Sequence, residues 1–161
     1  MNKKFIFVLG ILCLCSASCD LLSSDNSIPI HIETNKKHYN LKTDDSVEVT
    51  ITNKSKQTIH YSTCLSKTIE VVKKNKIVQT SGLPVCYCLC PAELKPGESM
   101  PVHNSSISVK SFQFHNNYRE STEPVEYRIK YSLFFDEAFG DAPVPPEYSR
   151  SNTFTITRVD G

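Results

Sequence analysis

The sequence predicts an all-β protein, an antiparallel β-sandwich of about seven to nine strands that follows an N-terminal signal segment. Two observations lead to this prediction. Apolar residues alternate with polar ones in short segments, and residues typical of turns separate those segments. Nowhere does an apolar pattern with a spacing of three and four residues run long enough for a substantial helix. Many short strands joined by turns are typical of a sandwich.

The first half of the chain supplies the early strands. A turn-like segment, residues 43–46, separates the first two of them, and a polar turn at residues 53–56 follows the second. Further on, Lys73-Lys74-Asn75-Lys76 reads as the solvated basic tip of a hairpin. Each strand is expected to be half-buried. The alternating apolar positions are Ile28, Ile30 and Ile32, then Val47, Val49 and Ile51, then Ile59 and Tyr61, and finally Ile69, Val71, Ile77 and Val78.

The second half continues the pattern after a tight turn. In Leu94-Lys95-Pro96-Gly97-Glu98, Pro96 fixes φ and Gly97 allows a positive φ. The longest strand is expected over residues 125–135, with one apolar face and one face in water. The apolar positions are Ile107, Val109, Phe112 and Phe114, then Val125, Tyr127, Ile129, Tyr131 and Leu133, and last Phe154 and Ile156.

Three of these segments carry a resemblance to a known group of domains. Val47-x-Val49-x-Ile51-Thr52-Asn53-x-Ser55, Leu94-x-Pro96-Gly97-Glu98-Ser99 and Glu126-Tyr127-Arg128-Ile129 resemble the bacterial immunoglobulin-like domains of exported lipoproteins. The bacterial intracellular proteinase inhibitors have a similar pattern. The resemblance covers roughly residues 30–159 and implies an immunoglobulin-like sandwich, here assigned to residues 28–161. It transfers no inhibitory residue to this chain.

The N-terminal residues form an export signal. Lys3 and Lys4 precede an apolar run, residues 5–15, and small residues follow up to Cys19. The run is shorter than the roughly 20 residues that a transmembrane helix needs. We therefore assign residues 1–18 to a signal peptide that is cleaved before Cys19.

Ala17-Ser18-Cys19 resembles a bacterial lipobox, with Ser16 standing where that motif usually carries Leu. The resemblance implies that Cys19 is acylated and anchors the protein to a membrane. Four cysteines then remain, an even number suited to an oxidising compartment, whereas plain secretion, the alternative, would leave five. Residues 19–27 are then a lipidated N-terminus with a flexible tether. The expected location is the bacterial cell envelope, as an inner- or outer-membrane lipoprotein.

The chain length and the net charge limit the number of domains and the classes of partner that we expect. The chain has 161 residues, and removal of the leader leaves one domain's worth. The formal net charge is +1, and it becomes −1 when Lys3 and Lys4 leave with the signal peptide. Nothing in this balance favours a nucleic-acid partner.

The remaining cysteines are Cys64 and the triplet Cys86, Cys88 and Cys90. We interpret them as a disulfide framework, in which Cys64 bridges to one of the triplet and three complete pairings are open. The alternatives are a Cu(I) site, with His60 or His103 as extra ligands, and a redox-active thiol. Zinc does not suit the spacing, because zinc ligands favour two to four intervening residues.

The loop over residues 136–150, DEAFGDAPVPPEYSR, is longer than a hairpin needs. Its proline run predicts a stiff polyproline II segment suited to recognition of an envelope protein partner. The predicted contact residues are Phe139, Pro145, Pro146 and Tyr148.

Taken together, these patterns predict a membrane-anchored cell-envelope lipoprotein with a non-catalytic binding or structural domain. We expect neither an enzyme nor a resident cofactor. The alternative is a copper-binding or thiol-redox protein that uses Cys64, Cys86, Cys88 and Cys90.

Overall fold

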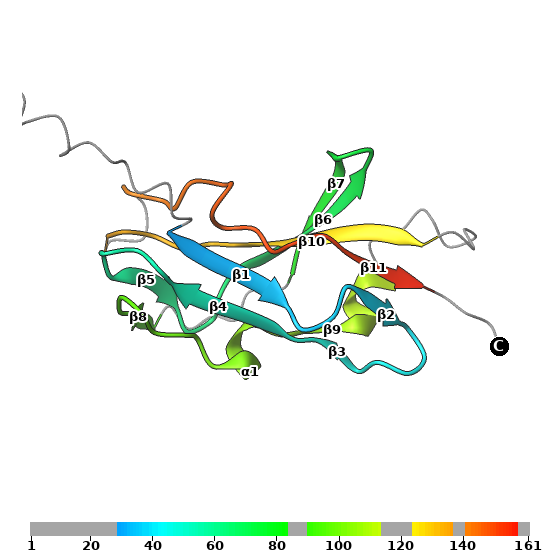
Figure 1. Cartoon of the computed structure of the whole chain (residues 1–161), viewed down its shortest axis with the longest axis horizontal. Coiled ribbons are helices and arrows are strands. Elements are labelled where there is room, and N and C mark those ends of the chain that lie inside the picture. The colour runs from blue at the N-terminus through cyan, green and yellow to red at the C-terminus, as the bar shows by residue number, and fades with distance from the viewer. Residues whose placement is uncertain (1–28, 84–89, 114–123, 137–140, 158–161) are drawn as a thin grey trace, which may run out of the picture.

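The computed structural model describes residues 29–83, 90–113, 124–136 and 141–157, and within them it confirms an all-β sandwich. One layer is a five-stranded sheet in the order β2-β11-β10-β6-β7. Three strand pairs, β1–β4, β3–β9 and β5–β8, provide the rest (Figure 1). The strands are β1 (Ile30–Thr34), β2 (His38–Asn40), β3 (Ser46–Val47), β4 (Val49–Asn53), β5 (Ile59–Ser62), β6 (Lys67–Lys73), β7 (Lys76–Gly82), β8 (Pro91–Leu94), β9 (Ile107–Ser108), β10 (Val125–Tyr131) and β11 (Phe154–Thr157).

The order β7-β6-β10-β11 is that of the larger sheet in variable-type immunoglobulin domains, where a strand C′ lies outside strands C, F and G. Two details differ from the expectation. The described part of the chain has eleven strands instead of seven to nine, because Glu48 divides one apolar run into β3 and β4, which pair with different partners. In addition, β2 runs parallel to β11, whereas the expected sandwich was antiparallel throughout.

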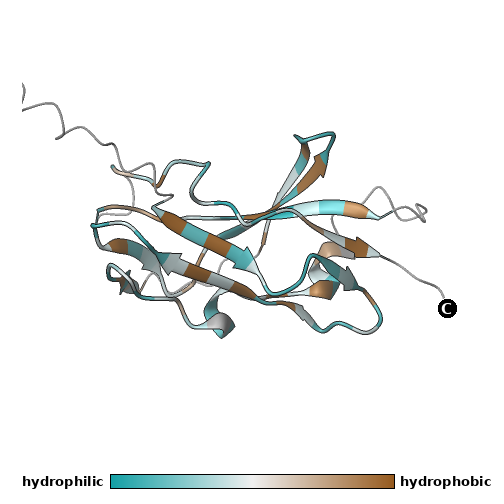
Figure 2. Cartoon of the chain, viewed as in Figure 1, coloured by the Kyte–Doolittle hydropathy of each residue, from teal (hydrophilic) through white to brown (hydrophobic). Residues whose placement is uncertain are grey.

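The core forms where the alternating faces of the two layers meet. Figure 2 shows apolar and polar residues alternating along β1 and β4. Val47, Val49 and Ile51 are fully buried, as is Ile129 on the facing sheet. Four rings, those of Tyr39, Phe112, Tyr127 and Phe154, meet at centroid distances of 5.2–6.1 Å, mostly edge to face. These strand faces are the ones that the alternation predicts, while Ile28 and Phe114 lie outside the described residues.

Three expectations about individual strands are corrected. The strand expected through Val109 and Phe112 is instead a 3₁₀ helix, η1 (Val109–Gln113), which still buries both residues. The strand expected over residues 125–135 leaves the sheet after Tyr131, because Phe134 bridges to His60 of the opposite layer and to Pro143. Ile77 and Val78 on β7 are 39% and 51% exposed, because β7 is the edge strand of the sheet.

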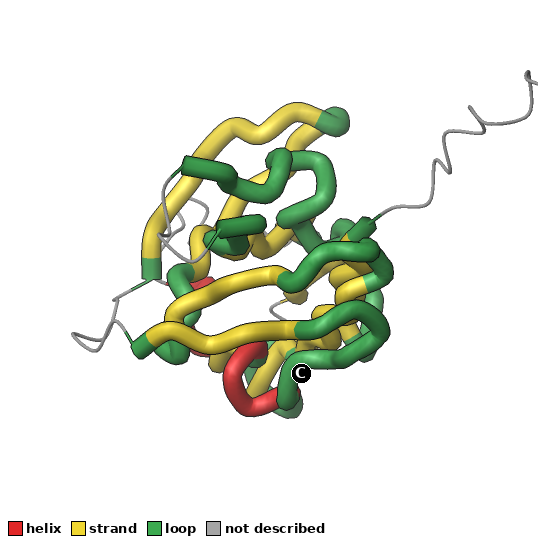
Figure 3. The backbone as a smooth tube through the Cα atoms, turned by 90° about the vertical axis from the view of Figure 1, so that its left-hand side faces the viewer, coloured by secondary structure: helices red, strands yellow, loops and turns green. Residues whose placement is uncertain are grey.

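The β6–β7 hairpin extends from one side of the molecule, and the short helix α1 (Val102–Ser105) lies at the opposite side (Figures 1 and 3). The hairpin turns at Lys74 and Asn75, both of which have positive φ, of 50° and 62°. Two consecutive residues of this kind make a turn whose twist matches that of the paired strands. The expected basic tip is therefore confirmed.

A buried ion pair joins β6 to the segment before β11. The carboxylate of Glu70 accepts hydrogen bonds from Nε of Arg150 at 2.8 and 3.0 Å, and its side chain is 2% exposed. The backbone of Arg150 also forms an isolated antiparallel β-bridge with Lys130 on β10, the strand beside β6. The pair therefore fixes the end of the 141–150 segment against the five-stranded sheet.

Removal of the Arg150 guanidinium should destabilise the fold, since it leaves the Glu70 carboxylate buried without a partner. We expect Arg150→Met to lower the free energy of unfolding by about 3–5 kcal/mol, measured by denaturant unfolding. The double variant Glu70→Leu/Arg150→Met removes the buried charge and should recover most of that loss. A double variant as unstable as the single one would contradict this account.

Asn53 is the second buried polar group that the fold depends on, and it is fully buried. Its Nδ2 donates to the carbonyl oxygens of Gln57 and Leu94, each at 2.8 Å. Its Oδ1 accepts from the backbone N–H and the hydroxyl of Ser55, at 2.9 and 2.7 Å. The amide thus uses its full hydrogen-bonding capacity to join the turn after β4 to the end of β8.

Truncation of Asn53 should remove its hydrogen bond to the buried carbonyl oxygen of Leu94 and take away the side-chain acceptor of the Ser55 N–H, whereas the exposed Gln57 carbonyl keeps the Ser55 hydroxyl as a donor. We expect Asn53→Ala to lower the free energy of unfolding by about 2–5 kcal/mol, because the variant loses four hydrogen bonds that contribute about 0.5–1.5 kcal/mol each. Lys54→Ala, at the exposed neighbouring position, should stay within about 0.5 kcal/mol of the wild type. Equal losses in the two variants would show that the Asn53 hydrogen bonds contribute little.

Candidate functional site

The described cysteines lie just beyond the paired ends of β5 and β8. Ser62 pairs with Pro91, and the N–H of Thr63 donates to the carbonyl oxygen of Cys90 at 2.8 Å. Cys64 is half-buried and Cys90 is exposed, and both are disulfide-bonded. Neither sulfur is therefore a free thiolate. Cys86 and Cys88 lie outside the described residues, so the complete pairing stays a prediction.

The histidines proposed as extra copper ligands lie in different places. His60 is in β5 and is 9% exposed, and its backbone exchanges hydrogen bonds with Phe134. His103 lies on α1 and is exposed. Within the described residues, no three His, Cys, Asp or Glu side chains gather closely enough to hold a metal ion.

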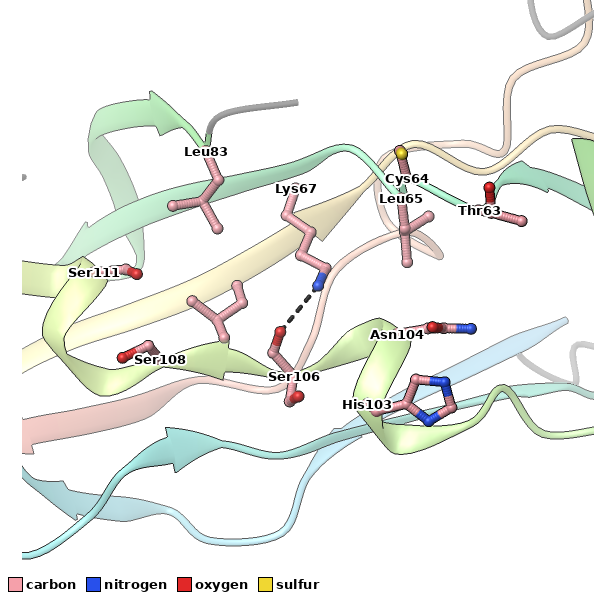
Figure 4. Close-up of a pocket in the computed structure, with 11 residues that line it drawn as sticks. Thr63, Cys64, Leu65, Lys67, Leu83, His103, Asn104, Ser106, Ser108 and Ser111 are labelled. Atoms are coloured by element: carbon pink, nitrogen blue, oxygen red, sulfur yellow. Dashed lines mark hydrogen bonds between the residues drawn. The ribbon is translucent and has the colours of Figure 1, made fainter. Parts of the chain in front are cut away.

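A cavity of about 430 Å³ opens beside Cys64 (Figure 4). We call it the Lys67 pocket, after the ammonium group at its centre. Residues 63–65, which follow β5, and Lys67, the first residue of β6, form one wall, and α1, β9 and η1 form the other. Its lining residues are Thr63, Cys64, Leu65, Lys67, Leu83, His103, Asn104, Ser106, Ile107, Ser108 and Ser111.

Of the described residues in this lining, Lys67 is the one that is charged, histidine apart. Its Nζ donates to the backbone carbonyl oxygen of Ser106 at 2.9 Å, which connects the two walls. Burial lowers the pKa of Lys67 below its usual 10.5, and no carboxylate among the described lining residues offsets that effect. The pocket therefore holds a partly dehydrated cation whose partner in the chain is a neutral carbonyl.

The remaining polar side chains of the Lys67 pocket are free to bind. Within the part of the chain that the structure describes, no hydrogen bond joins the side-chain hydroxyl or amide groups of Ser106, Ser108 and Asn104 to another residue. The hydroxyl groups of Thr63 and Ser111 are in the same situation. Their hydrogen-bonding capacity is directed to solvent or to a ligand.

The described end of the 136–150 loop, residues 141–150, is more firmly packed than a display segment would be. Val144 is 5% exposed, and its N–H donates to the carbonyl oxygen of Leu133 at 2.9 Å. Tyr148 is half-buried and packs against the core, whereas Pro146 is exposed and Pro145 is half-buried. Both prolines line a second hollow of about 270 Å³. Phe139 lies outside the described residues, and the predicted role of this loop in partner recognition stays a prediction.

The sequence analysis missed the Lys67 pocket, because its residues are distributed over three separate segments. The signal was the density of small hydroxyl residues between Asn104 and Ser111 on short elements that pack against the start of β6. Alternation of apolar residues records burial, and it carries no information about which polar residues meet across a cavity.

Comparison with models of known protein families and with curated proteins gave no match for this chain. Among the described residues, no helix is long and apolar enough to cross a membrane.

Loss of the Cys64 disulfide should weaken the fold and release a thiol. We expect Cys64→Ser to lower the free energy of unfolding by about 2–5 kcal/mol and to leave one cysteine that reacts with a thiol reagent without prior reduction. Thr63→Ser, at the exposed neighbouring position, is the matched control and should unfold as the wild type does. Unchanged stability of Cys64→Ser, or no new reactive thiol, would contradict a structural role for this bond.

Proposed function

We propose that this protein is a cell-envelope lipoprotein, anchored in a bacterial membrane through acylated Cys19, whose β-sandwich is a non-catalytic binding module. The observation that carries the proposal is the sequence of the N-terminal residues: Lys3 and Lys4, the apolar run of residues 5–15, and then Ala17-Ser18-Cys19, with β1 beginning soon after at Ile30. The disulfide-bonded state of Cys64 and Cys90 also favours an exported domain, because such bonds persist in oxidising compartments.

The anchor would keep the domain close to the bilayer. Residues 19–27 would form the tether, and an extended segment of that length reaches roughly 30 Å. The sandwich would then meet molecules within a short distance of the membrane. The unpartnered polar groups of the Lys67 pocket favour binding over a purely structural role. An envelope protein could dock beside the 141–150 segment.

We do not carry a copper-binding or thiol-redox role forward as a second proposal. Copper binding needs free thiolates, and two of the four cysteines of the exported domain are disulfide-bonded. For a thiol-redox role, the C-x-C spacing of the triplet lacks the C-x-x-C motif that lowers a thiol pKa.

Substitution of Cys19 should release the protein from the membrane. We expect Cys19→Ala to move from the membrane fraction to the soluble fraction and to lose incorporation of a labelled fatty acid, because no lipid chain can be attached. Wild-type protein, held by more than one chain, should sediment with membranes, since a single chain anchors only marginally.

Cys15→Ala is the matched control, because Cys15 lies in the apolar run of the same leader. It should stay in the membrane fraction and keep the label. Firm membrane association of Cys19→Ala would overturn the proposed anchor.

A further inference from the structure

We propose that the Lys67 pocket binds a hydroxylated organic carboxylate, the chemistry of sugar acids and hydroxy acids. This inference rests on the proposed binding role of the sandwich and does not depend on the lipid anchor. Three properties of the pocket lead to it: the charge of Lys67, the unused hydrogen-bonding groups around it, and the mixture of apolar and polar walls.

The charge of Lys67 favours an anion. A lysine ammonium has three N–H donors, and the structure gives one of them to the Ser106 carbonyl oxygen. Among the residues that the structure describes, the lining contains no aspartate or glutamate. A partly buried cation without an acidic partner is stabilised by an anionic ligand, because hydrogen bonds between ionised groups are stronger than those to neutral oxygens.

The neighbouring side chains favour a ligand with hydroxyl groups. Ser108 and Ser111 lie toward one end of the pocket, and Thr63 and Asn104 lie toward the other, with Lys67 between them (Figure 4). Hydroxyl and amide groups both donate and accept hydrogen bonds, as the hydroxyl groups of a sugar do. An ion without such groups would leave these side chains to water.

The apolar walls set the size and the organic nature of the ligand. Lys67 extends between Leu83 and Leu65, and both leucines point into the pocket (Figure 4). Leu65 and Ile107 are nearly buried, at 7% and 4% exposed, whereas Leu83 is half-buried. Leu83 therefore offers a ligand more apolar surface than the other two side chains do. The volume of about 430 Å³ lies within the usual range for small-molecule sites. A monosaccharide-sized acid suits this space better than an inorganic ion does.

Chemical labelling of lysine tests the proposal on the full-length chain in detergent. A mild acylating reagent modifies exposed amines, and tandem mass spectrometry measures the labelling rate at each lysine. We expect D-glucuronate to slow the labelling of Lys67 saturably, by at least about fivefold, because a bound carboxylate covers Nζ and holds its protons. Lys110, exposed on η1, serves as the internal control and should label at a constant rate.

Matched ligands separate the contribution of the carboxylate charge from that of the hydroxyl groups. D-glucuronamide, which has the same hydroxyl groups without the charge, should need about tenfold higher concentration for half-protection, the cost of one charge-assisted hydrogen bond. Protection by lactate as well would place hydroxy acids in the class, and protection by glucuronate alone would restrict the class to sugar acids. Equal protection by the amide and the acid, or protection by inorganic phosphate alone, would overturn the proposal.

A variant of the wall tests the role of the polar side chains. Asn104→Ala removes an amide that has no hydrogen-bond partner in the described part of the chain, so the fold should keep its stability. We expect about a fivefold higher half-protection concentration of glucuronate, the effect of one neutral hydrogen bond. No saturable protection of Lys67 in the wild type would refute the site, while the membrane fractionation of Cys19→Ala reports on the anchor separately.

Discussion

The Asn53 amide is the constraint on which one layer of the sandwich depends. It is fully buried, and its four side-chain hydrogen bonds join the turn after β4 to the end of β8. Its backbone adds two more, since its N–H donates to Glu98 and its carbonyl oxygen accepts from Gly97. Gly97 has a φ of 82°, a conformation that other residues adopt only with strain. Two sequence motifs that are distant along the chain therefore form one structural unit.

The position of the candidate site follows from that unit. Because Asn53 holds Leu94, it sets where β8 lies, and β8 pairs with β5 up to Ser62 and Pro91. The chain that leaves β5 then carries Cys64 and Lys67 to the wall of the Lys67 pocket. A buried hydrogen-bond network and a nearby disulfide thus hold the same wall, and the network and the covalent bond restrict different motions. The binding groups are placed on a rigid support as a result.

Sequence patterns predicted the parts of the fold in which local alternation of apolar and polar residues is enough to tell which side chains are buried. Val49 and Ile51, or Tyr127 and Ile129, alternate with polar neighbours, and that alternation is sufficient to assign the buried face. The pattern could not show that β7 is an edge strand, so the exposure of Ile77 and Val78 was missed.

The candidate site was harder to predict than the fold. Cys64, which lies apart from the other three cysteines of the domain in the sequence, was the one pocket residue besides His103 that the sequence analysis singled out as a candidate site residue. Lys67 looks like any strand lysine until β9 and η1 are placed against it, because burial of a charge is a property of the tertiary structure. The serines of the opposite wall are equally ordinary in sequence. Their significance lies in facing a cation across a cavity.

If Cys19 anchors the protein as proposed, the exposed edge at β7 would face the edges of neighbouring copies on the same membrane surface. Confinement to a plane raises the rate at which two molecules meet, and an unpaired strand edge with exposed apolar residues is a template for sheet-to-sheet association. Lys73, Lys74 and Lys76 place like charges at the tip of that edge, and the irregular pairing at Val71 and Val72 disturbs its flatness. The basic hairpin would thus keep a crowded layer of these molecules from polymerising.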